Sequence, residues 1–144
     1  MGPSKHLMVS TILALLLLAT TQHHFVLPVV FGAGWLVDFD HYIEFLANKG
    51  LRKWSAFQEF LDSTQFDESG RIILLFHGYE HGGLLFILYV LSEWNIVFGA
   101  LFLAYSIHLV MDVVGNRHQV PLFYFFTYRF LKRFNHAQLT TQKA

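Results

Sequence analysis

The sequence has no cysteine and few charged residues. Lys, Arg, Asp and Glu together make up 14% of its 144 residues, against about 25% in an ordinary soluble domain. Without cysteine there is no disulfide framework and no thiolate metal site, so any metal ion must be bound by His, Asp or Glu. The formal net charge of +0 also argues against nucleic acid as a direct partner, because nucleic-acid-binding domains carry basic patches.

What the sequence has instead is long apolar stretches. Hydrophobic residues make up 54% of the chain, its mean hydropathy is +0.42, and these residues are clustered in runs long enough to cross a bilayer. We therefore expect an all-α integral membrane protein with a single membrane domain, residues 1–144, built as a bundle of four transmembrane helices plus short interfacial helices. The expected spans are about 4–21, 25–47, 71–91 and 96–114, with an interfacial or re-entrant segment at 121–134 and either a surface helix or a solvated loop at 48–70.

The basic residues set the orientation of this bundle. In the four-span arrangement all ten Lys and Arg residues fall on one side, and the loops after the first and third spans contain none. Basic loops stay in the cytoplasm, so we expect a multi-pass protein with both termini cytoplasmic and the lipid bilayer as its partner. The apolar residues 7–19 also resemble the core of a signal peptide, but residues 19–22 form a poor cleavage site, which favours a retained helix.

Ionisable residues interrupt the second apolar stretch. Asp38, Asp40 and His41 follow the run that begins at Phe25. A charged residue at the centre of a span costs roughly 2.5–3.5 kcal/mol, which suggests a functional role. Asp38 and His41 are three residues apart and share one side of a helix, whereas Asp40 lies about 200° from Asp38 on a regular helix. Either the helix is irregular here, or one of the two aspartates only supports a ligand.

Polar residues on all four expected spans fall at the cytoplasmic end. His77 and His81, like His108 and Asp112, are four residues apart, so each pair projects from one face of its helix. Facing helices of a bundle build metal sites from such residues. Apart from Lys5 and Arg71 at the ends of two spans, the spans contain no Lys or Arg to neutralise their acidic side chains, which favours one or two bound divalent ions. The expected ligands are His6, Asp38, His41, His77, His81, His108 and Asp112.

Other interpretations of the histidines stay open. A single His in an apolar helix is more often a hydrogen-bonding structural residue than a ligand, so the metal site depends on the coincidence of the whole set. His23, His24 and His136 lie outside it and have no assigned role, and His118 lies in a loop near the same end. Nitrogen and oxygen ligands without sulfur suit Zn, Mn or Fe without choosing among them, and zinc is our first expectation.

The order of these residues resembles a known family. The chain contains, in order, His6, Gly34, Asp38-Phe39-Asp40-His41, Gly78-Tyr79-Glu80-His81, His108-Leu109-Val110-Met111-Asp112 and Val120-Pro121-Leu122. Over residues 5–125 this pattern resembles the YdjM-type family of small inner-membrane proteins, which are described as LexA-binding and as metal-dependent hydrolases. The resemblance implies an inner-membrane location and the same activity. The His-x-x-x-Asp element is also similar to that of zinc-dependent phospholipase C enzymes, which implies hydrolysis of an ester or phosphoester.

The chain departs from the family at one element. The family usually reads His-Arg-Gly-x-Thr-His-Ser where this chain has Phe76-His77-Gly78-Tyr79-Glu80-His81-Gly82. Phe76 thus replaces the first family histidine, and Glu80 replaces the threonine. The resemblance implies that His77 takes over the lost ligand position by a shift of one residue.

The polar cluster and the resemblance together imply a membrane-embedded metal-dependent hydrolase of an ester or phosphoester; the hydrolase activity is implied by the resemblance alone, and a lipid-like substrate is suggested by the location. The metal would lower the pKa of a bound water molecule. Asp40 or Glu80 would act as the general base, and Arg117 would contact a substrate phosphate.

Two non-enzymatic alternatives remain. One is a haem or electron-transfer protein that uses His77 or His81 opposite His108, although haem ligation needs no carboxylates. The other is a regulatory or partner-binding protein in which a metal ion only stabilises the fold. The sequence does not separate this second alternative from the hydrolase.

Overall fold

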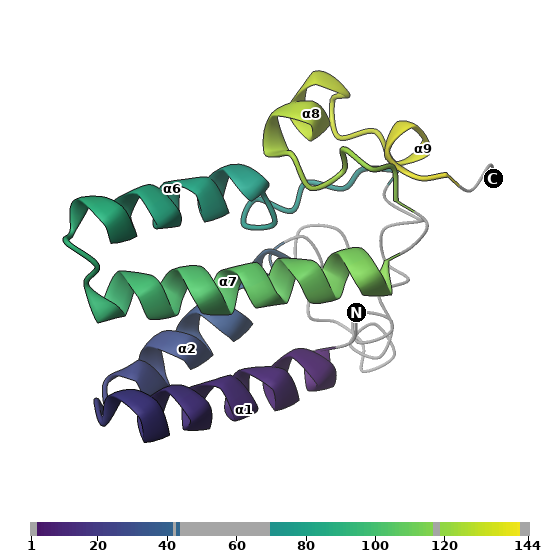
Figure 1. Ribbon diagram of the computed structural model, residues 1–144. Coiled ribbons are helices and arrows are strands. Elements are labelled where there is room, and N and C mark those ends of the chain that lie inside the picture. Colours follow the sequence, from purple (N-terminus) through teal and green to yellow (C-terminus); the bar gives the residue numbers. More distant parts are fainter. Residues whose placement is uncertain (1–2, 42, 44–69, 117–118, 142–144) are drawn as a thin grey trace.

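The computed structural model describes residues 3–41, 43, 70–116 and 119–141, and the regular secondary structure of these residues is helical (Figure 1). The prediction of an all-α protein is therefore confirmed for this part of the chain. The helices are α1 (Pro3–Thr21), α2 (Val26–Trp35), the 3₁₀ helix η1 (Leu36–Asp38), α6 (Tyr79–Leu91), α7 (Ile96–Gly115), α8 (Phe126–Leu131) and α9 (His136–Leu139). Helical backbone continues past η1 through residues 39–41.

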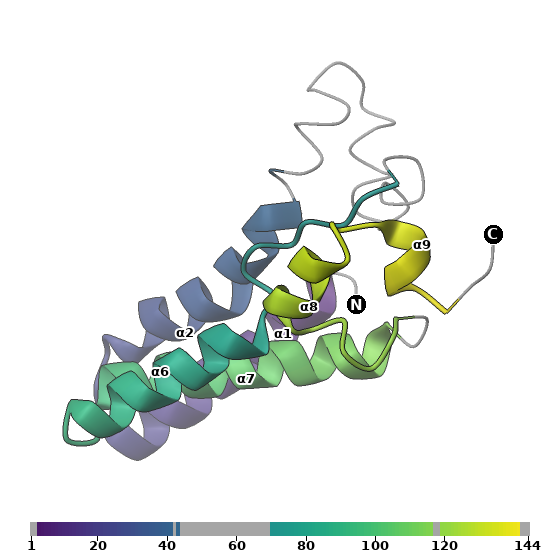
Figure 2. The same cartoon turned by 90° about the horizontal axis from the view of Figure 1, so that it is seen from above.

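The longer helices α1, α2, α6 and α7 form a bundle around α7. Both α2 and α6 pack on α7, while α1 packs mainly on α2 and also contacts α7. The turn between α1 and α2 and the turn between α6 and α7 lie at one end of the bundle, and α8 lies at the other (Figures 1 and 2). The beginnings of α1 and α6 and the ends of α2 and α7 therefore meet at the end next to α8.

The buried face of α7 changes from apolar to polar along the helix. Its buried residues are Ala100, Ala104, Tyr105, His108, Leu109 and Asp112. They recur every three or four positions, as expected for one face of a helix. The helix begins at a cap in which the Asn95 side chain accepts a hydrogen bond of 2.9 Å from Val97 N, a common arrangement at a helix N-terminus. Helix α7 thus buries small apolar side chains at its start and a His–Asp pair at its end.

Two apolar clusters hold the bundle together. The first joins α1, α2 and α7 through the small side chains of Ala14, Val30, Ala100 and Ala104. Gly34 extends this close approach, because a Cβ atom there would clash with the hydroxyl group of Ser10. The second cluster joins η1 and α7 to the segments before α6 and after α7, and contains Val37, Ile72, Leu74, Tyr105, Leu109, Phe123, Tyr124 and Leu139.

The expected span at 71–91 is wrong in its first part. Helix α6 begins at Tyr79, and residues 71–78 are not helical. Ile72 and Leu74 are buried while Ile73 and Leu75 are exposed, which is the alternation of an extended backbone. His77 therefore lies in the loop before α6, and the prediction that it shares a helix face with His81 is wrong.

The backbone groups of this loop find partners outside it. Arg129 donates hydrogen bonds to the carbonyl oxygens of Leu74 and His77, and Ile72 N donates to Phe134 O at 2.9 Å. In a helix these groups would bond within the helix itself. The loop is extended because the segment after α7 supplies the partners that a helix would otherwise supply.

The four-span arrangement is not supported by the described helices. By length and composition α7 is the one described helix that could cross a membrane. Helices α2 and α6 have 10 and 13 residues, and the apolar part of α1 runs over Lys5–Thr21. The segment 121–134 contains the six-residue helix α8, and its Phe123 and Arg129 are fully buried. Residues 48–69, where a surface helix or loop was expected, lie outside the described part of the chain.

Candidate metal centre

Helix α7 supplies two side chains to a buried polar cluster at the end of the bundle next to α8. His108 and Asp112 are 2% and 3% exposed, and His108 Nε2 lies 3.2 Å from Asp112 Oδ2. Their i,i+4 spacing places both on the buried face of the helix. The pair predicted from the sequence is therefore present in the structure.

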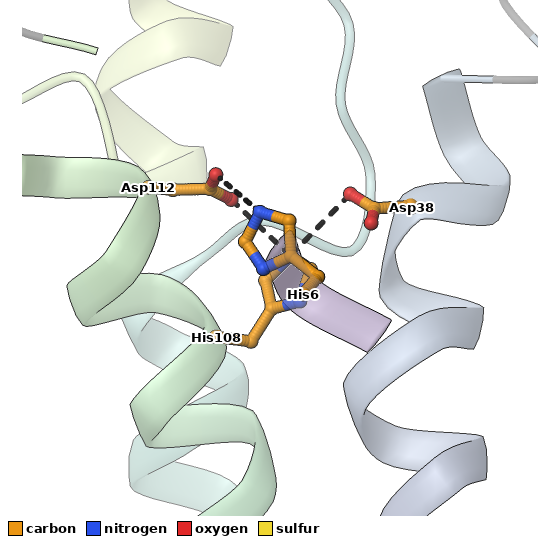
Figure 3. Close-up of side chains that lie close together, drawn as sticks. All are labelled: His6, Asp38, His108 and Asp112. Carbon is orange, nitrogen blue, oxygen red and sulfur yellow. Dashed lines mark hydrogen bonds and ion pairs between the residues drawn. The ribbon is translucent and has the colours of Figure 1, made fainter. Parts of the chain in front are cut away.

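Helix α1 brings His6 to the same place. Its Nε2 lies 3.1 Å from Asp112 Oδ1, and its ring stacks on that of His108 with 4.1 Å between the centroids. In Figure 3 the two histidines lie between Asp112 on one side and Asp38 on the other. Residues 106 positions apart in the sequence thus share one contact.

Asp38 faces the cluster from η1. Its Oδ1 lies 3.5 Å from Nε2 of both His77 and His108. Asp40 points in another direction: its Oδ2 accepts a hydrogen bond of 2.8 Å from Phe76 N and lies 3.0 Å from His77 Nδ1. The helix is irregular at Asp38, and Asp40 supports a candidate ligand, so both of the alternatives raised by the sequence apply.

The loop before α6 supplies His77. Its Nε2 lies 3.3 Å from Asp112 Oδ2 and 3.3 Å from His108 Nε2. His41 lies at the edge of the cluster, with its Nε2 3.9 Å from Asp38 Oδ1 and its ring 4.8 Å from that of His77.

Two overlapping sets of residues could therefore hold a metal ion. The ligand atoms within each set lie within 4.8 Å of one another. One set is His6, Asp38, His108 and Asp112, and the other is Asp38, His41 and His77. Asp38 belongs to both sets. Together the sets contain every ligand predicted from the sequence except His81.

The two central imidazoles are held through their outer nitrogens. His108 Nδ1 lies 3.0 Å from the carbonyl oxygen of Gly34, and His77 Nδ1 lies 3.0 Å from the carboxylate of Asp40. A carbonyl and an ionised carboxylate only accept, so each Nδ1 carries the hydrogen and a neutral ring presents a lone pair at Nε2. Metal-binding histidines are oriented in this way.

When the two imidazoles are neutral, hydrogen-bond acceptors of this cluster face one another. The Nε2 atoms of His77 and His108 are 3.3 Å apart and lie beside carboxylate oxygens of Asp38 and Asp112. Imidazole lone pairs and carboxylate oxygens this close together repel one another electrostatically. A positive charge must lie among them, as protons on the imidazoles or as a metal ion, and the imidazole and carboxylate donors fit a divalent ion.

Arg129 lies beneath the loop that carries His77. It is 0% exposed. Its Nη1 donates to His77 O at 2.8 Å and to Phe123 O at 2.7 Å, and its Nη2 donates to Leu74 O at 2.7 Å. Burial lowers the pKa of Arg129 from its ordinary value, an effect that nearby carboxylates partly offset, and an arginine side chain stays charged under such conditions.

The sequence did not identify Arg129 as a site residue, because it appeared as one of several basic residues that set the orientation. The available signal was its position among aromatic residues. Its guanidinium carbon lies 5.3 Å from the ring centroid of Phe123 and 5.9 Å from that of Phe126, as in cation–π contacts.

Three predicted site residues lie apart from the cluster or outside the described chain. Glu80 faces α8, where its carboxylate accepts hydrogen bonds from Phe126 N at 2.9 Å, from Thr127 N at 3.0 Å and from Thr127 Oγ1 at 2.8 Å. His81 belongs to neither ligand set and lines an apolar pocket. Arg117 lies outside the described residues.

Comparison of this chain with family models, with curated proteins and with solved structures finds no match. The resemblance to the YdjM-type family therefore stays an expectation from the sequence.

Proposed function

We propose that this chain is a membrane-embedded, metal-dependent hydrolase of an ester or phosphoester, with its centre at the end of the bundle next to α8. The observation that supports this most directly is the convergence of three imidazoles and two carboxylates on one buried point. They come from the start of α1, from η1, from the loop before α6 and from the end of α7. Zinc is the metal ion that we expect these ligands to bind, and manganese and iron are the alternatives.

A divalent ion in such a site lowers the pKa of a bound water molecule and polarises an ester or phosphoryl oxygen. The chain itself holds the rings in place: Gly34 O accepts from His108 Nδ1, and Asp40 accepts from His77 Nδ1. Partners of this kind fix the ligand nitrogen and raise its basicity. The contacts of Asp40 favour this positioning role over the general-base role expected from the sequence.

The cluster is most open on the side of Asp38 and His41. Their side chains are 16% and 22% exposed, whereas that of His77 is 1% exposed. Substrate therefore approaches from this side. With a metal ion held by the other set, His6, Asp38, His108 and Asp112, His41 Nε2 would lie next to the Asp38 carboxylate and would accept a proton from the attacking water, a role that histidine performs in many hydrolases.

The outer surface of the bundle supports a membrane location. On α6, Leu84, Ile87 and Leu91 follow one another at helical spacing and are 55%, 53% and 76% exposed. On α7, Val110 is 61% exposed. Soluble monomers rarely expose large continuous apolar surfaces. A bilayer around the bundle would cover them.

Metal content and hydrolysis test this proposal together. Purified protein should contain a stoichiometric divalent ion and hydrolyse p-nitrophenyl esters or bis-p-nitrophenyl phosphate. The variants His108→Ala and Asp112→Ala should lose both the metal and the activity. His23→Ala and His24→Ala, in the turn at the opposite end of the bundle (Figure 1), are the controls and should keep both.

Other outcomes separate the alternatives. Folded protein that binds no metal would refute the proposal. Bound metal without hydrolysis of any ester or phosphoester would leave the non-enzymatic protein with a structural metal. A haem between His77 and His108 is disfavoured, because carboxylate oxygens of Asp38 and Asp112 lie beside their Nε2 atoms, where the porphyrin ring would have to lie.

A further inference from the structure

An apolar pocket of about 560 Å³ lies between α2, α6 and α7. Its walls include Val29 and Ala33 of α2, Leu85 of α6 and Leu101 of α7. This volume falls within the range of about 300–1,000 Å³ typical of ligand pockets. The pocket is thus large enough for a ligand, and it is open to the outside of the bundle.

The surface of this pocket offers almost no hydrogen bonding. Among the lining residues only His81 and Tyr105 carry polar side-chain groups. The Tyr105 hydroxyl is already engaged, lying 2.7 Å from the carbonyl oxygens of Phe76 and Gly78. A sugar, a nucleotide or a peptide would leave its own polar groups unpaired here, which is unfavourable. The lining suits a hydrocarbon.

The pocket and the metal centre share segments of backbone. Val37 and Phe39 line the pocket, and they flank Asp38, the ligand common to both sets. Phe76 also lines the pocket and directly precedes His77. The pocket and the centre thus lie on neighbouring parts of the same two segments, and the ligand sets themselves do not line the pocket.

The pocket opens through apolar residues. Phe39 and Phe76, which line it, are 49% and 42% exposed. On α6, Phe86, which follows the lining residue Leu85, is 45% exposed. A chain that enters the pocket from this side passes over apolar surface and would come from the bilayer rather than from water.

We propose that this pocket binds the hydrocarbon chain of a lipid substrate, whose ester or phosphoester group lies at the metal centre. The proposal rests on the hydrolase function proposed above and names its substrate class. The apolar lining and the apolar opening point to a lipid chain, and the backbone shared with the centre places that chain near it. Each methylene buried in the pocket would raise the affinity about fourfold.

Binding is tested without reference to hydrolysis. The protein in phosphatidylcholine nanodiscs receives a phosphatidylglycerol whose acyl chain ends in a diazirine, and the cross-linked peptides are mapped by mass spectrometry. Label is expected on pocket residues of α2, α6 and α7. The variants Leu85→Trp and Leu101→Trp would fill the pocket and should remove this label. The control variants Leu84→Trp and Leu103→Trp change exposed positions on the same helices and should keep the label.

Chain-length dependence provides the second measurement. With p-nitrophenyl esters of two to twelve carbons, KM of the unmodified protein should fall by up to about fourfold per methylene. The fall should disappear in Leu85→Trp and persist in Leu84→Trp.

The outcomes distinguish this proposal from the proposed function. Labelling of the pocket with no hydrolysis would support lipid binding and refute the hydrolase. Hydrolysis with a KM independent of chain length, and no label in the pocket, would refute the lipid pocket and leave the hydrolase. Equal label on the pocket and on the outer face of α6 in every variant would also refute it.

Discussion

At the scale of single residues, the cluster depends on the groups that accept hydrogen bonds from the Nδ1 atoms of its imidazoles. The ring of His77 is fixed by Asp40, and that of His108 by the carbonyl oxygen of Gly34. Only the first of these is a side chain, so only Asp40 can be changed without moving the backbone.

Asp40→Asn should weaken metal binding by about 10–100-fold, the usual effect of changing a group that orients a ligand. The amide oxygen can still accept from His77 Nδ1, but it no longer carries the charge that raises the basicity of the ring. Metal affinity measured by competition with a chelator checks this. If affinity is unchanged while turnover falls by about 10²–10⁴, Asp40 is the general base expected from the sequence.

Glu80→Gln should keep its metal and lose less than about tenfold in turnover, against the 10²–10⁴ expected for removal of a base. The reason is that the Glu80 carboxylate contacts α8 at Phe126 N and Thr127 N and not the cluster. The free energy of unfolding should fall instead, by about 0.5–2 kcal/mol, which is the usual loss when a helix cap is removed. Metal content, turnover and melting temperature of one preparation provide the comparison. Loss of metal or a large fall in turnover would contradict the contacts described for Glu80.

At the scale of elements, α8 holds the loop before α6. Arg129 is fully buried. Its two Nη atoms donate hydrogen bonds to two carbonyl oxygens of that loop and to one of the segment before α8. This planar fork cannot be reproduced by lysine. The position of His77 is thus set by a helix that contributes no ligand itself.

Arg129→Lys should therefore destabilise the fold and weaken metal binding together. Each lost hydrogen bond to a charged group costs about 1.5–3 kcal/mol, and the loop with His77 is released. The melting temperature should fall, and the rise in melting temperature on adding zinc should shrink. The nearby Lys132→Arg, on a half-buried residue outside these contacts, is the control. An unchanged response to zinc in Arg129→Lys would show that the loop is held by other contacts.

The same elements show what the sequence could predict. The His108–Asp112 pair was recognised because helical spacing alone brings it together on α7. The loop before α6 was misread because Ile72, Ile73, Leu74 and Leu75 are all apolar. Buried and exposed positions alternate along these residues, but the same residue types occupy both, so the sequence does not show the alternation. The choice between helix and loop there is made by the Arg129 hydrogen bonds, which join residues 52 and 55 positions apart.

At the scale of the whole molecule, the basic residues of the described chain gather at one end. Lys5 begins α1, Arg71 lies in the loop before α6, and Arg129, Lys132 and Arg133 lie in and after α8. The turns at the other end, residues 22–25 and 92–95, contain no Lys or Arg. If the bundle lies in a membrane as proposed, the positive-inside rule would place this end, with the proposed metal centre, on the cytoplasmic side.

Cysteine labelling tests this orientation directly, because the chain has no cysteine of its own. A membrane-impermeant maleimide should label His24→Cys and Glu93→Cys in intact spheroplasts. Gln138→Cys, in α9 at the end with the metal centre, should react only after lysis. Labelling of Gln138→Cys in intact spheroplasts would reverse the orientation. Labelling of all three only after lysis would contradict a membrane-spanning bundle.

The contact between His6 and Asp112 has a consequence for synthesis of the protein. The two side chains are 106 residues apart, so the first ligand leaves the ribosome long before the last. At a synthesis rate of roughly 5–20 residues per second, several seconds pass between the synthesis of His6 in α1 and that of Asp112 in α7. The proposed centre is complete only when α7 has joined α1 in the bundle, so a metal ion would bind after these helices have assembled.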